Sequence, residues 1–199
     1  ENESKYITST KKALNYGVYG VDLAYLATNK QFKEVPKYFA ATRNLAISLD
    51  AAESFDKVMS ARIESNLENQ DTITRLMDEA FEATDSYLRS NERELVAVII
   101  LAGGWIESQN ITFHLLKDQD KNEKNEFLYK NLWEQQFHLN SITDLLKQYE
   151  KEAELKPLIE KMSALNEDFK KIKSDTDITK EKVSELAVKI RAIREMIIK

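Results

Sequence analysis

Glycine and proline are scarce in this chain: 4 glycines and 2 prolines occur among 199 residues. They make up about 3% of the chain, against a usual share of about 12%. Tight turns depend on both, because glycine adopts positive φ without steric cost and proline fixes φ in advance. A β-rich fold needs many such turns, so we do not expect one here. The sequence predicts an all-α protein.

Apolar residues recur at intervals of three and four, which is the spacing of one helix face. The closest fit is a run of eight residues: Ile73, Leu76, Met77, Ala80, Phe81, Thr84, Tyr87 and Leu88. The pattern predicts about eight helices, over residues 6–28, 35–49, 55–67, 73–88, 92–116, 126–151, 158–172 and 183–197. We expect them to form antiparallel helical hairpins that pack as a bundle.

The segment 23–46 alternates small and aromatic residues where two antiparallel helices would interlock. This style of packing is like that of a tetratricopeptide helix pair. No 34-residue repeat follows, and Pro36 falls early in the second helix rather than at the end of a repeat. The segment therefore predicts tetratricopeptide-like packing without an array.

The predicted organisation is a single all-α domain over residues 1–199, with three parts. Residues 1–116 form a core of helical hairpins, and residues 117–125 (KDQDKNEKN), the most polar stretch, form a linker. Residues 126–199 supply a long helix and a C-terminal hairpin.

The C-terminal hairpin is predicted from two narrow apolar stripes with 4, 3 spacing, as in a coiled coil. The first comprises Leu158, Met162, Leu165, Phe169 and Ile172, and the second Val183, Leu186, Ile190, Ile193 and Ile197. A narrow stripe buries little area alone, so the hairpin needs a partner surface. That surface is either the rest of the chain or a second copy, which makes a homodimer through this hairpin one prediction.

Polar residues on apolar helix faces are the candidate ligand-binding residues, because burial requires them to find hydrogen-bond partners. In one such helix the candidates are Asp22, Tyr19 and Tyr25, with Tyr16 nearby. The Asp22 carboxylate has a raised pKa in a binding site, accepts a structural hydrogen bond from a tyrosine hydroxyl, or faces water.

The segment Leu101–Asn110 (LAGGWIESQN) holds the other candidates: Trp105, Glu107 and Asn110. Two glycines inside a helix each cost about 1 kcal/mol relative to alanine. Close approach of a neighbouring helix, a bend or a bound ligand would compensate, and close helix packing is the commoner reason. Glu107 and Asn110 share a face, either in a polar pocket under Trp105 or at a solvated edge.

Composition and motifs exclude several kinds of site. The chain has no cysteine and two histidines, and its net charge is −5. Thiolate chemistry, disulfides and histidine-rich metal sites are thus excluded, and an acidic chain is not expected to bind nucleic acid. No phosphate-binding or nucleophile-elbow motif occurs. We predict no catalytic residue, no metal and no cofactor. The longest apolar run, Leu95–Ile106, has 12 residues, short of a membrane span.

Two segments, Asn15–Tyr25 (NYGVYGVDLAY) and Leu101–Glu107 (LAGGWIE), resemble those of a family of uncharacterised lipoproteins of Bacteroidota. The resemblance covers residues 13–150. It implies export and tethering in the periplasm or cell envelope through a lipidated cysteine that would precede Glu1. The family carries no known activity, so it assigns no catalytic residue, and a cytoplasmic location stays open.

Three functions follow, in order of preference. The first is a non-enzymatic envelope protein that presents a groove to a protein partner and acts as a scaffold. The second is a small-molecule-binding protein with a pocket near Asp22, Trp105 and Glu107. The third is an enzyme that uses Asp22 or Glu107 as an acid or base.

Overall fold

The computed structural model describes residues 3–51, 61–62, 65–66 and 69–199. They form seven α-helices: α1 (Ser9–Thr28), α2 (Val35–Ser48), α4 (Gln70–Ser90), α5 (Glu94–Leu116), α6 (Glu126–Lys147), α7 (Lys156–Phe169) and α8 (Lys180–Ile198). Two short 3₁₀ turns, η1 (Glu3–Lys5) and η3 (Asp175–Asp177), complete the elements. These residues contain no strand, so the all-α prediction is confirmed. The helix predicted over 55–67 falls largely outside the described residues.

Side-chain caps explain where several helices begin. The hydroxyl of Thr8 accepts a hydrogen bond from the Lys11 amide at the start of α1. At the start of α4 the Asn69 side chain accepts one from the Thr72 amide. Each cap satisfies one of the amide groups that the first turn of a helix leaves unpaired. The helix predicted over residues 126–151 is α6, and it ends at Lys147.

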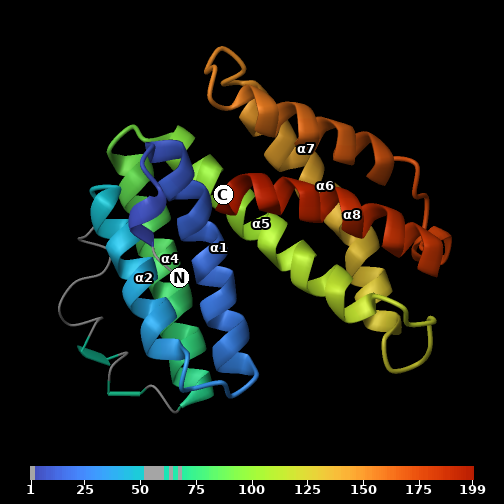
Figure 1. Cartoon of the computed structure of the whole chain (residues 1–199), viewed down its shortest axis with the longest axis horizontal. Coiled ribbons are helices and arrows are strands. Elements are labelled where there is room, and N and C mark those ends of the chain that lie inside the picture. The colour runs from blue at the N-terminus through green and yellow to red at the C-terminus, as the bar shows by residue number, and fades with distance from the viewer. Residues whose placement is uncertain (1–2, 52–60, 63–64, 67–68) are drawn as a thin grey trace. The chain divides into compact units, whose positions relative to one another are not determined.

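The chain divides into two compact units, residues 1–104 and 105–199. In the first unit α2 and α4 pack against α1, as the blue, cyan and green helices of Figure 1 show. More than half of α1 is buried, including Tyr16, Tyr19 and Leu23. The first unit is therefore built around α1, in line with the apolar residues on nearly all sides of that helix.

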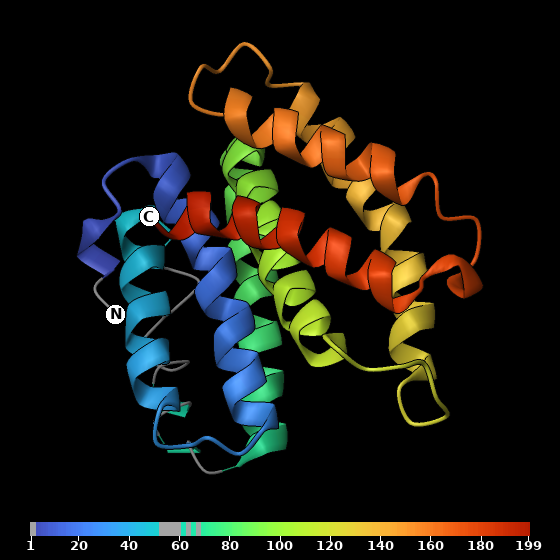
Figure 2. The same cartoon turned by 45° about the vertical axis from the view of Figure 1, so that its right-hand side comes forward.

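In the second unit α6 packs against α7, and α7 packs against α8 (Figure 2). Every residue of the two predicted hairpin stripes is buried. The hairpin thus finds a partner surface within the chain, because α6 lies against α7. The predicted linker, 117–125, is a loop inside this unit, where Lys121 forms an ion pair with Asp175 at 2.7 Å. The unit boundary instead follows Gly104, inside α5.

Among the described residues, α5 alone is long and apolar enough to cross a membrane by length and composition. Half of its most apolar window is buried within the protein. Core helices have the same composition, and α5 supplies core residues to both units: Ala102 in the first and Ile106 in the second.

Candidate functional site

The three candidate residues of α1 differ in burial. Tyr19 is buried, whereas Asp22 and Tyr25 are half-buried. The Tyr19 ring packs against two other aromatic rings, with centroid distances of 6.4 Å to Tyr6 and 5.7 Å to Tyr38. Its contacts are those of a core aromatic residue.

The most deeply buried tyrosine of this helix is Tyr16, which the sequence did not single out as a candidate. Its ring is fully buried, and its hydroxyl lies 2.9 Å from the Thr84 hydroxyl on α4. The Thr84 hydroxyl also donates to the Ala80 carbonyl. Burial strongly raises the pKa of Tyr16, although the Thr84 hydrogen bond opposes this. Tyr16 thus links α1 to α4 as a neutral group.

We expect Tyr16→Phe to lower the free energy of unfolding at neutral pH by about 1 kcal/mol, because one buried hydrogen bond is lost. An unfolded tyrosine ionises at a pKa of about 10. Since the pKa of folded Tyr16 is higher, the unfolded state loses its proton first, and stability falls as pH rises above about 10. Tyr16→Phe lacks this pH-dependent loss of stability, so urea unfolding should show a smaller difference in free energy of unfolding from the unchanged protein at alkaline pH than at neutral pH. The control Tyr87→Phe, at a half-buried position, should lose stability above about pH 10 as the unchanged protein does. An equal dependence of the free energy of unfolding on alkaline pH in both variants would contradict the prediction.

The paired glycines lie where α5 meets α1 within the first unit. A Cβ atom on Gly103 would lie 2.1 Å from the carbonyl oxygen of Leu14, and one on Gly17 would lie 2.2 Å from that of Ile100. Real Cβ atoms do not approach backbone so closely. Close packing of two helix backbones therefore accounts for Gly103 and Gly17, whereas a Cβ atom on Gly104 would make only ordinary contacts.

The candidate residues of the second unit are already engaged with other side chains. Trp105 is buried, packs edge-on against Phe169 at 6.3 Å, and donates from Nε1 to Gln135 at 3.0 Å. Glu107 is 2% exposed and forms an ion pair with the Arg194 guanidinium of α8. Asn110 donates to the second Glu107 carboxylate oxygen at 3.2 Å. Trp105 and Glu107 thus tie α5 to α6, α7 and α8.

The partners in these contacts were missed by the sequence analysis. Arg194 follows the buried stripe residue Ile193, and no sequence pattern distinguishes it from the other basic residues of this helix. Gln135 is one of several polar residues on a long helix. Only the three-dimensional contact distinguishes either residue from its neighbours.

Metal binding has little support among the described residues. No group of three or more His, Cys, Asp or Glu side chains there is arranged to hold a metal ion. Glu134 and His138 lie one turn apart on α6, but they are only two side chains, and His138 is exposed.

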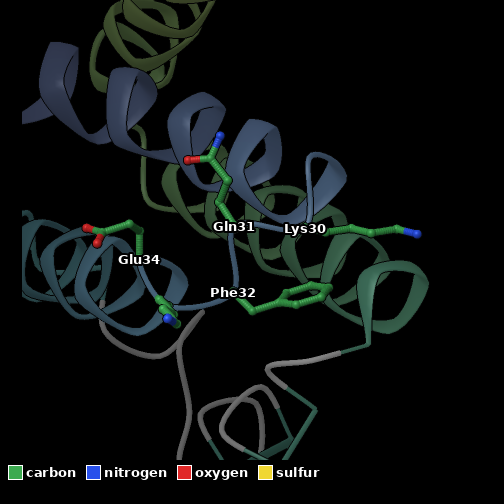
Figure 3. Close-up of a pocket in the computed structure, with 5 residues that line it drawn as sticks. Lys30, Gln31, Phe32 and Glu34 are labelled. Atoms are coloured by element: carbon green, nitrogen blue, oxygen red, sulfur yellow. The ribbon is translucent and has the colours of Figure 1, made fainter.

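Open hollows at the surface of the described residues include two that lie near the start of a helix. One, of about 500 Å³, is lined by five consecutive residues of the α1–α2 loop: Lys30, Gln31, Phe32, Lys33 and Glu34. Figure 3 shows the Phe32 ring and the Lys30 side chain extending to the same side of this loop. The other, of about 490 Å³, is lined by Glu150, Lys151, Lys156, Ile159 and Glu160. None of the six candidate residues lines either hollow.

The outer face of α6 exposes aromatic surface. We define this face by the residues Lys130, Trp133, Phe137, Ser141 and Asp144, which follow one another at helical spacing. Phe137 is 61% exposed, Trp133 is half-buried, and their rings meet edge-on at 6.1 Å. The opposite side of α6 carries buried residues such as Leu132 and Leu139. Water is a poor environment for so much aromatic area, so this face is a candidate docking surface.

No protein-family model, curated protein or solved structure matches the chain.

Proposed function

We propose that this protein is a non-enzymatic helical module that binds a protein partner and serves as a scaffold. The observation that carries the proposal is the exposed aromatic pair on the α6 outer face, where Phe137 is 61% exposed beside Trp133. Aromatic side chains supply much of the binding energy at protein interfaces, because they bury large areas with few rotatable bonds. Lys130 and Asp144 give this aromatic centre a charged rim.

Binding of a small molecule near Asp22, Trp105 and Glu107 is the alternative function. We favour protein binding because Trp105 and Glu107 already satisfy their polar groups within the second unit. A ligand at these side chains would have to replace a hydrogen bond to Gln135 and an ion pair to Arg194, at a cost in free energy.

For location we propose the periplasm or cell envelope, on the resemblance to the Bacteroidota lipoproteins alone. Membrane attachment would come from a lipid anchor upstream of Glu1. Fractionation of cells that express the protein from its own gene tests this part. Recovery of the protein in the cytoplasmic fraction would contradict it.

Photo-crosslinking in living cells tests the binding function. A benzophenone amino acid replaces Phe137, and in a control protein it replaces Ala164, an exposed position of α7 in the same unit. We expect the first protein to give a cross-linked adduct of discrete mass and the control to give none. If the two positions gave the same products, the α6 outer face would not be a binding surface.

A further inference from the structure

We infer that the partner of the α6 outer face is a second copy of this chain, bound antiparallel about a twofold axis at Phe137. The inference rests on the proposed function and deepens it. Its basis is the order of charges along the face: Lys130 lies seven residues before Phe137, and Asp144 lies seven residues after it. With a rise of about 1.5 Å per residue, each charge lies about 10 Å from the ring.

An antiparallel twofold pairing places Lys130 of each copy opposite Asp144 of the other. It therefore forms two intermolecular ion pairs around a Phe137–Phe137 contact. A parallel pairing would place Lys130 against Lys130 and Asp144 against Asp144, which like-charge repulsion disfavours. The face is thus complementary to itself in one orientation only, as a symmetric dimer interface requires.

Side-chain sizes along the face agree with the same pairing. Trp133 lies four residues before Phe137 and Ser141 four residues after it, so the antiparallel arrangement sets each indole opposite a serine of the other copy. The Ser141 hydroxyl donates to the Phe137 carbonyl of its own helix, so this small side chain does not protrude from the helix surface. A large ring opposite a small residue allows two helices to pack closely.

The acidic end of the face is held in place from within the unit. The Asn140 amide donates to the Asp144 carboxylate at 2.9 Å, and its oxygen accepts from the buried Asn166 amide at 3.0 Å. Lys147 lies 3.9 Å from the same carboxylate. Ordering the carboxylate beforehand lowers the entropy that an intermolecular ion pair would cost.

The basic end of the face carries the exposed Lys130 side chain. Its charge is the weakest of the effects that lower the pKa of Asp175, and the hydrogen bond from Lys121 is the largest. Because Lys121 already pairs with Asp175 at 2.7 Å, Lys130 can turn to Asp144 of a second copy. One helix face is small for an interface, so we expect a weak dimer that forms at high protein concentration.

Sedimentation velocity over a wide range of concentrations tests the inference on the full chain. We expect the sedimentation coefficient to rise with concentration, and Phe137→Glu to abolish the rise. Phe127→Glu is the matched control, because Phe127 is 59% exposed on the same helix but points about 80° away. A chain that stays monomeric throughout, or equal loss in both variants, would overturn the inference.

Charge exchange tests the orientation. Lys130→Asp and Asp144→Lys should each weaken dimerisation about tenfold or more, and the double variant should restore it. Neither change opposes the dipole of α6, since the acid moves toward its N-terminus and the base toward its C-terminus. If dimerisation is not restored in the double variant, the antiparallel pairing is wrong. A cross-link from position 137 to a different protein would refute self-association while leaving the proposed binding function intact.

Discussion

Gly103→Ala is expected to lower the free energy of unfolding by about 2–3 kcal/mol, the upper range for overpacking a core. The added methyl group would lie 2.1 Å from the Leu14 carbonyl oxygen and 2.9 Å from the Leu14 Cα. Both atoms are backbone, so no side chain can rotate away, and α1 and α5 must move apart. Loss of contact along that crossing outweighs the gain of about 1 kcal/mol in helix propensity that alanine brings.

The neighbouring residue supplies the control. A Cβ atom on Gly104 would lie 3.5 Å from the Gly17 carbonyl oxygen and 3.6 Å from a methyl carbon of Val21, which are ordinary contacts. Gly104→Ala should therefore keep the propensity gain and raise the free energy of unfolding by up to about 1 kcal/mol. The two substitutions add the same atoms at adjacent positions and are expected to act in opposite directions.

Urea unfolding followed by circular dichroism measures both effects, with Gly17→Ala as a third variant. Gly17 faces the Ile100 carbonyl oxygen across the same crossing, so its substitution should destabilise the protein about as much as Gly103→Ala. Equal effects of Gly103→Ala and Gly104→Ala would show that α5 meets α1 in a different register.

The sequence predicted the helices well because the periodicity of apolar residues reports directly on local structure. The C-terminal stripes are the best example, since all of their members from Leu158 to Ile197 are buried. The sequence also identified the glycine pair as a place where a neighbouring helix, a bend or a bound ligand would compensate for the lost helix propensity. It could not say which glycine matters more, because successive residues of a helix point about 100° apart.

The unit boundary was not predictable for a related reason. It follows Gly104, inside α5, where the helix continues without interruption. The polar composition of residues 117–125 led to the prediction of a linker there. Lys121 of this loop forms an ion pair with Asp175 within the second unit. Composition indicates how far a segment is exposed to solvent. It does not indicate where the boundary between two compact units lies.

The candidate residues show the same limit. Tyr19, Asp22 and Tyr25 belong to the first unit, and Trp105, Glu107 and Asn110 belong to the second. Within the second unit, Trp105 and Asn110 form side-chain hydrogen bonds and Glu107 forms an ion pair. The ion-pair partners are distant in sequence: Glu107 and Arg194 are 87 residues apart. No local pattern specifies such a pair.

Arg194→Leu is expected to be among the most destabilising single substitutions in the second unit, lowering the free energy of unfolding by about 3–5 kcal/mol. It would leave the Glu107 carboxylate, which is 2% exposed, with a hydrogen bond from the neutral Asn110 amide in place of its ion pair. A buried charge without its counterion is costly because the interior solvates it poorly. Glu107→Leu should cost less, since the Arg194 side chain is 25% exposed and its guanidinium can turn toward water.

The double variant Glu107→Leu/Arg194→Leu separates the value of the ion pair from the cost of breaking it. Replacing both members removes both charges, and a buried ion pair is often no more stabilising than apolar side chains of similar size. We therefore expect the double variant to be more stable than Arg194→Leu alone, with a coupling energy of about 1–3 kcal/mol in urea unfolding. Additive losses would contradict this, because they would mean that Glu107 and Arg194 stabilise the second unit through separate contacts and not through each other.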